Sequence, residues 1–402
     1  DAEELMKSGG IDLQAKLQVA AWIGFGLLAL RCVMRRRADL NLLLHAPLAW
    51  FVFYAATTVL SSVYSISPPL TLFRSGQGVI AILLVVSLRD GLNRLHVFIA
   101  MYLVGNWIFF LMANTGLDFG QAWIRGPDND YMIFGSHSGR TWRLATPLGH
   151  PSQISIVGAA GAAGLLAKTT RRNLRRHLPL ILFCAVTVLL TISRTAIAGM
   201  VVGCLIVLAA RRRLVPVMLI GGMLIPLMVL IPSISESLVK YGMRGQSSEE
   251  FQSLTGRSTI YQQGLQRAGD ALPLGEGFCA GRVRMIVAKE AGSSIVHSHN
   301  LFIESAVGMG VLGIVGAALV LITLAVSLCR VIRIPPNETG ISPGWEPVAM
   351  AVPLLAFCTL DRGFASPAAP FLILFIALLA LTARLLRDHH QQTIPFRPSH
   401  AR

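Results

Sequence analysis

The feature that most constrains this chain is its series of long apolar stretches, separated by short polar segments. A helix needs about 20 mostly apolar residues to cross the hydrocarbon core of a bilayer. Only 14% of the residues are charged, whereas soluble domains carry about 25%. We therefore expect an all-α polytopic membrane protein, with residues 1–402 forming a single integral membrane domain. The about eleven expected spans are 17–34, 43–64, 70–88, 95–113, 148–167, 178–193, 195–210, 214–231, 301–328, 347–360 and 368–386.

The short basic clusters predict the orientation of these spans. Each cluster follows an odd-numbered span, as Arg35–Arg37, Lys168–Arg176 and Arg211–Arg213 do. Cytoplasmic loops of membrane proteins are enriched in Lys and Arg, so these loops are predicted to be cytoplasmic. The net charge of +15 then has a membrane explanation, and no nucleic-acid partner is expected.

The same orientation assigns the remaining segments. It places two long loops outside, 114–147 and 232–300, and a polar tail at 387–402 in the cytoplasm. It also places Asp1 outside, so we expect a further helix before this residue. The alternative is an N-terminus that lies outside.

Metal-binding and disulfide patterns are weak in this sequence. The six cysteines include no CxxC spacing, and we interpret them as small buried apolar residues. Asp128-Asn129-Asp130 resembles the Asp-x-Asp with which some transferases hold a cation, but Asp and Asn are also ordinary turn residues. We expect no metal and no cofactor.

A charge divides two of the apolar spans. Arg194 separates 178–193 from 195–210, which favours a tight hairpin over one long helix. An unpaired charge is costly there, so Arg194 is a functional candidate, with snorkelling to lipid headgroups as the alternative. The planar fork of a guanidinium suits the oxygens of a diphosphate.

The loop 232–300 contains most of the remaining candidates. A helix is expected to begin at 255–261 and to end near Gly269, and Pro273–Gly277 is predicted to form a tight turn. His297 and His299 directly precede the span at 301–328. Neutral imidazole can accept a proton near physiological pH. The alternative reading of His299 is a histidine that caps the helix or contacts headgroups.

Several motifs together resemble one family. His299-Asn300, nine further residues and then Gly310-x-x-Gly313 is similar to the H-[NSQ]-x9-G-x-x-G signature of the O-antigen ligases. Ser193-Arg194 resembles the Ser-Arg pair of that family, and Gly256-Arg257 resembles its second arginine. His150-Pro151 is another similar feature. Family members typically have twelve spans with both ends inside, so the spans expected here are one short.

The resemblance implies a glycosyltransferase of lipopolysaccharide biosynthesis in the bacterial inner membrane. It would transfer a glycan from undecaprenyl diphosphate to lipid A–core oligosaccharide at the periplasmic face, by a metal-independent inverting displacement. His299 would be the catalytic base, and Arg194 and Arg257 would bind the diphosphate.

Further residues are expected to support this site. Asn300 would orient His299 or cap the helix, and His297 would shape the site. Arg74 would be either a third diphosphate contact or part of a structural ion pair. Gly310 and Gly313 would let helices approach closely.

Two other functions stay open. A polysaccharide polymerase would use the same lipid-linked donor with a different acceptor. A transporter of lipid-linked sugar would show inverted repeats and broken helices at mid-membrane, and the sequence indicates neither.

Overall fold

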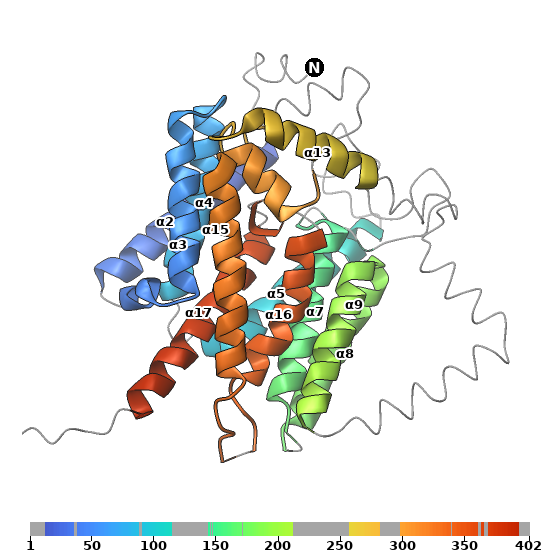
Figure 1. Ribbon diagram of the computed structural model, residues 1–402. Coiled ribbons are helices and arrows are strands. Elements are labelled where there is room, and N and C mark those ends of the chain that lie inside the picture. The colour runs from blue at the N-terminus through green and yellow to red at the C-terminus, as the bar shows by residue number, and fades with distance from the viewer. Residues whose placement is uncertain are drawn as a thin grey trace, which may run out of the picture.

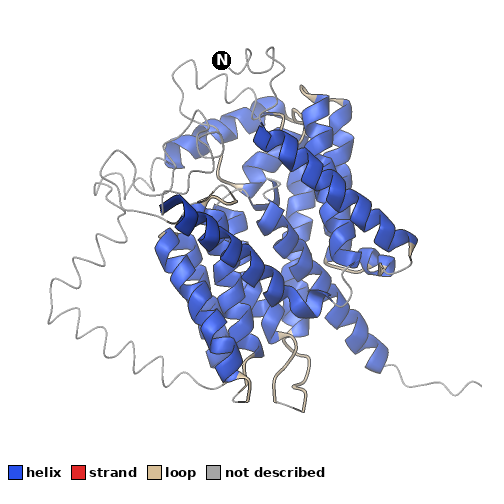
Figure 2. Cartoon of the chain, turned by 180° about the vertical axis from the view of Figure 1, so that it is seen from behind, coloured by secondary structure: helices blue, strands red, loops and turns tan. Residues whose placement is uncertain are grey.

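The computed structural model describes a bundle of helices, with no strand among the described residues (Figure 2). The described residues are 13–35, 38–87, 91–114, 144, 146, 148–170, 172–211, 257–281, 298–338, 340–360, 363–365 and 369–393. The expected span at 214–231, most of the loop 114–147 and His297 lie outside them.

The apolar runs form helices close to the expected bounds (Figure 1). The α-helices are α2 (Leu13–Met34), α3 (Leu48–Leu60), α4 (Pro68–Ser87), α5 (Leu95–Asn114), α7 (Pro151–Lys168), α8 (Leu174–Thr191), α9 (Arg194–Ala210), α13 (Arg257–Ala271), α15 (Leu301–Val331), α16 (Trp345–Leu360) and α17 (Ala369–Thr393). Short 3-10 helices are η1 (Leu40–Leu44), η2 (Ser61–Val63), η3 (Gly91–Arg94) and η5 (Gly363–Ala365).

The lengths and compositions of these helices fit a multi-pass membrane protein. Among the described residues, five helices are long and apolar enough to cross a membrane, namely α4, α5, α8, α15 and α17. Four shorter apolar helices lie in α2, α3, α9 and α16. The all-helical architecture is thus confirmed for the described part of the chain, whereas the count of about eleven spans stays a prediction.

Helix α7 lies at the centre of one half of the bundle, against α5, α8, α9 and α16. Its middle is a run of buried Gly and Ala, which lets neighbouring helices come close. A methyl group added at Gly161 would lie 2.7 Å from Ile99 Cγ2, and one at Gly164 would lie 2.6 Å from Met350 Cγ. Small residues therefore make α7 a packing core of this half of the bundle.

The described basic clusters meet at one end of the bundle, which we call the basic end. Lys168 Nζ lies 2.7 Å from Glu346 Oε1, which joins the end of α7 to the start of α16. Arg211 donates to the carbonyl oxygens of Thr169 and Ala167, which joins the end of α9 to the end of α7. The α7–α8 and α15–α16 connections and the end of α17 all lie on this side in Figure 1, and α13 lies on the opposite side, the α13 end.

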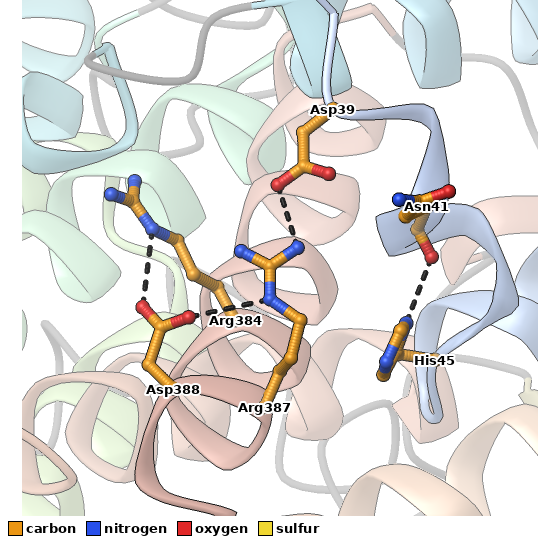
Figure 3. A network of polar contacts seen from close by, with 6 residues as sticks. All are labelled: Asp39, Asn41, His45, Arg384, Arg387 and Asp388. Atoms are coloured by element: carbon orange, nitrogen blue, oxygen red, sulfur yellow. Dashed lines mark hydrogen bonds and ion pairs between the residues drawn. The ribbon is translucent and has the colours of Figure 1, made fainter. Parts of the chain in front are cut away.

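An ionic network holds α17 at the basic end (Figure 3). Arg387 Nη1 donates to Asp39 Oδ2 at 2.7 Å, and Arg387 Nε donates to Asp388 Oδ1 at 3.3 Å. Asp39 N also donates to the carbonyl oxygen of Val86 at 3.0 Å, so the linker after α2 is bound to α4 as well. The expected polar tail at 387–402 begins within the last turns of α17, which continues to Thr393, and its cytoplasmic position stays a prediction. The ion pair supplies Arg387 with a partner inside the bundle.

We predict that the basic end faces the cytoplasm. In a variant whose native cysteines are replaced by alanine, Glu338→Cys at the basic end should be protected from a membrane-impermeant maleimide in intact cells. Gln262→Cys, exposed on α13, should be labelled. Both should react after the membrane is permeabilised. The reverse pattern in intact cells would show that the positive-inside orientation is wrong.

Candidate functional site

The α13 end is organised around an interruption of α15 at Gly310. This residue has φ 59° and ψ −141°, which divides α15 into a first part at 301–309 and a long part at 311–331. The sequence predicted a continuous helix here, with no broken helix, and the structure corrects that prediction. Figure 1 shows α13 lying across this end of the bundle beside α15.

Backbone groups freed by the interruption are bound by an earlier part of the chain, the 273–278 segment. Glu276 N donates to the carbonyl oxygen of Val307 at 2.8 Å, and Gly277 N donates to that of Gly308 at 2.8 Å. Val311 N donates to the carbonyl oxygen of Pro273 at 2.9 Å. The segment therefore replaces hydrogen bonds that an unbroken helix would make within itself.

Glycine is required on both sides of this contact. A methyl group added at Gly310 would lie 1.8 Å from the carbonyl oxygen of Pro273. Gly275, in the expected tight turn, has φ 84°, and a methyl group there would lie 2.6 Å from Gly310 N. A methyl group at Gly313 would lie 2.3 Å from the carbonyl oxygen of Ser305. Gly310 and Gly313 thus permit a break in α15, and their expected role in helix–helix approach stays a prediction.

The 273–278 segment is also bound on its other side, by the turn between α3 and α4. Ile66 N donates to the carbonyl oxygen of Glu276 at 3.0 Å. Phe278 N donates to Ser61 Oγ at 3.0 Å, and Thr71 Oγ1 donates to the carbonyl oxygen of Phe278 at 3.2 Å. The break in α15 is therefore fixed to the N-terminal helices.

His299 directly precedes Asn300, the residue that caps the start of α15. Its φ of 49° is in the left-handed region, which costs a residue with a side chain about 1–2 kcal/mol. Asn300 Oδ1 accepts from Phe302 N at 2.9 Å and from Ile303 N at 3.3 Å. The prediction that Asn300 caps this helix is confirmed. The half-buried His299 is thus held in a strained conformation at the helix entry.

Helix α13 packs directly over this strained residue. Tyr261 Oη lies 3.5 Å from the carbonyl oxygen of His299. A methyl group added at Gly264 would lie 3.2 Å from Ser298 Cβ. Farther along the helix, Ala268 packs with Ile303, Ala306 and Val307. The expected helix after residue 255 is confirmed, and its position covers His299 on one side.

The second predicted arginine begins this helix. Arg257 is the first residue of α13, one turn before Tyr261, so their backbones are separated by about 6 Å along the helix. The side chain of Arg257 lies outside the described part of the structure. At the other end of α13, Arg267 forms an ion pair with Glu276, which binds the helix to the 273–278 segment.

Arg194 is the first residue of α9 and follows the turn of the predicted α8–α9 hairpin, which the structure confirms. Ile192 in this turn has φ 50°. Helix α9 runs antiparallel to α16, because a methyl group added at Gly199 would contact Pro353 and one added at Gly203 would contact Ala349. Arg194 therefore lies level with the last turn of α16. That turn leads to η5, whose Ala365 carbonyl oxygen lies 3.7 Å from Cys279 Sγ.

Arg74 lies on α4, where its Nη1 donates to Gln77 Oε1 at 3.3 Å. With Tyr54, Thr58 and Ser75 it lines a cavity of about 20 Å³. This volume holds about one water molecule. Tyr54 Oη lies 3.0 Å from Ser305 Oγ, so the cavity wall reaches the first part of α15.

His150 and the possible metal ligands are the remaining predicted features. His150 caps α7 by accepting from Ser152 N at 3.3 Å, at the α13 end. Asp128 and Asp130 lie outside the described residues. Within the described ranges, no three His, Cys, Asp or Glu side chains form a group that could hold a metal ion.

Sequence reasoning missed the acidic residue nearest to His299 in the chain among those described. Glu304 is 9% exposed, and its Oε1 accepts from Ser298 N at 2.9 Å. An acidic residue inside an otherwise apolar span was the available signal, because such charges are expensive in a membrane.

The part of the chain that forms the α13 end is also similar to a known protein family. Residues 179–318 match the family described as O-antigen ligase. The matched region includes Arg194, the whole of α13, His299 and the interruption of α15. A comparison with curated proteins finds no match.

We predict that Gly310→Ala destabilises the α13 end. Strain at φ 59° and the collision with Pro273 should lower the free energy of unfolding by about 2–4 kcal/mol. Gly76→Ala in α4 is the control, since an added methyl group meets nothing within 4 Å, and it should be neutral or stabilise by up to about 1 kcal/mol. Thermal unfolding of the two detergent-solubilised variants measures the difference, and equal midpoints would contradict the described break.

Proposed function

We propose that this chain, which its residues 179–318 assign to the O-antigen ligase family, transfers a glycan from undecaprenyl diphosphate to lipid A–core oligosaccharide. The family assignment supports a ligase- or polymerase-type enzyme that acts on a lipid-linked glycan in a membrane. One observation carries the finer proposal. His299, the start of α13 and the start of α9 all lie at the end of the bundle opposite the basic end.

The proposed chemistry is a single displacement at the anomeric carbon of the donor. His299 accepts the proton of the acceptor hydroxyl while that oxygen forms the new bond to the anomeric carbon. The bond from this carbon to the diphosphate oxygen breaks, and undecaprenyl diphosphate leaves. Because attack and departure are in line, the anomeric configuration inverts.

The arginines would act on the leaving group. Negative charge grows on the diphosphate as its bond to the sugar breaks, and fixed positive charge near it lowers the barrier. Arg194 and Arg257 are the proposed donors, since a guanidinium offers two parallel N–H bonds to phosphate oxygens. Diphosphate is a good leaving group, so the mechanism requires no strong general acid and no metal.

The setting of the reaction follows from the predicted orientation. If the basic end faces the cytoplasm, the α13 end faces the periplasm of a cell with an inner membrane. Both substrates are lipid-anchored, so the site would open sideways to the outer leaflet. Arg74, which lines the cavity beside Tyr54, stays a candidate for a supporting role.

A polymerase is the second candidate, because the family assignment supports both types of enzyme. The two differ in the acceptor. Purified protein given only lipid-linked glycan should form longer lipid-linked chains if it is a polymerase. A ligase should form product only when lipid A–core is added. Movement of the donor across the bilayer without a new glycosidic bond would indicate a transporter.

We predict that His299→Ala abolishes glycan transfer, since the variant lacks the proton acceptor. In a strain that displays long-chain lipopolysaccharide through this protein, the variant should leave lipid A–core without attached glycan on gels. His390→Ala, an exposed histidine at the basic end, should give the normal pattern. Normal long-chain lipopolysaccharide in the His299→Ala strain would refute the proposed base.

We predict that Arg194→Lys lowers kcat/KM by about 100-fold, because lysine keeps the charge but loses the two parallel N–H bonds, and good charge-assisted contacts are worth about 2–3 kcal/mol. Arg175→Lys makes the same change at an exposed position of the basic end and should leave the activity unchanged. Initial rates with purified proteins measure both. Equal activity of the two variants would exclude a fork-specific role for Arg194.

A further inference from the structure

We infer that Glu304 is a positioning residue for His299, acting through the backbone of Ser298. The inference rests on the proposed function, in which His299 accepts the proton of the acceptor hydroxyl. Glu304 would hold the imidazole of His299 in place before the substrates bind.

The contact itself is short and shielded from solvent. Glu304 Oε1 accepts from Ser298 N at 2.9 Å, while Glu304 is 9% exposed and Ser298 is fully buried. A buried backbone N–H needs a partner, and a carboxylate is a stronger acceptor than a neutral group. Loss of the carboxylate would therefore leave the N–H of Ser298 unpaired in a site closed to water.

The contact lies on one side of His299, and the cap lies on the other. Ser298 is held by Glu304, and Asn300 is held by its own bonds to Phe302 N and Ile303 N. Ser298 Oγ also donates to the carbonyl oxygen of Asn300 at 3.4 Å, which closes the turn around His299. Both neighbours of His299 are thus fixed to the first two turns of α15.

The hydrogen bonds of Ser298 and Asn300 matter because His299, between them, has a left-handed backbone conformation. A residue in this region persists only where its surroundings hold it, and such strain gathers at functional sites. If Glu304 releases Ser298, the backbone at His299 can return to an extended conformation. The imidazole would then move although His299 itself is unchanged.

Helix α15 in turn holds Glu304 in place. The following residue, Ser305, is fully buried and lies 3.0 Å from Tyr54 Oη on α3. Ile303, on the other side, packs against Gly264 and Ala268 of α13. The carboxylate therefore projects from a turn that two other helices clamp.

The test compares two substitutions that differ in one respect. Glu304→Gln keeps a carbonyl oxygen that accepts from Ser298 N, whereas Glu304→Ala removes the acceptor. With full-length protein, lipid-linked glycan and lipid A–core, Glu304→Ala should lower kcat by about 10- to 100-fold with little change in KM. Glu304→Gln should restore most of the activity. Glu346→Ala removes a partly buried, ion-paired carboxylate at the basic end and is the matched control, expected to lower thermal stability but to keep kcat.

A second measurement does not depend on glycan transfer. The rate at which diethyl pyrocarbonate modifies His299, followed by mass spectrometry, should change in Glu304→Ala and match the unsubstituted protein in Glu304→Gln. If the unsubstituted protein transfers no glycan, the proposed function fails while this rate still tests the contact. Unchanged kcat and modification rate in Glu304→Ala would overturn the inference. Equal damage by both substitutions would overturn it too, because the charge and not the accepting atom would then matter.

Discussion

Three backbone hydrogen bonds between the 273–278 segment and the interrupted turn of α15 determine the architecture of the α13 end. In a bilayer, each backbone group freed by a break must find a partner within the protein. Glu276, Gly277 and Pro273 supply these partners, and the missing side chains of Gly275 and Gly310 let the two backbones meet. Without them, α15 would continue as one straight helix, and the entry that carries His299 would lie elsewhere.

The same segment connects elements that are far apart in the sequence. It binds the α3–α4 turn through Ile66 and Ser61, and it binds α13 through the Arg267–Glu276 ion pair. Helix α13 in turn packs over Ser298 and His299. The described parts of the loop 232–300, which was expected to carry the chemistry, therefore pack against the bundle. Packed elements can hold side chains in fixed positions.

The sequence predicted the features that depend on local composition. Apolar runs gave the described helices, and the charge at Arg194 gave the α8–α9 hairpin, since a guanidinium is placed most easily at a helix end. The break at Gly310 escaped prediction because the run after Glu304 carries no charge as far as Leu328 and the partner of the break lies more than 30 residues earlier. The contact between Glu304 and Ser298 escaped prediction as well, because it depends on the conformation of the turn that precedes α15. The contact of Arg387 with Asp39 escaped prediction too, because the two residues lie almost the whole chain apart.

These fixed contacts bear on the type of catalysis that the α13 end can support. Displacement of a diphosphate needs charges that are in place before the bond breaks, because reorganising them during the reaction would consume the stabilisation that they give. The start of α9 is fixed through α16 by the Gly199–Pro353 contact, and α13 is fixed over α15 by Gly264 and Ala268. His299 is fixed by the cap and by Ser298. The elements that begin at Arg194 and Arg257 and the turn that holds His299 are thus linked through α15, which packs against both α13 and α16, as a preorganised site requires.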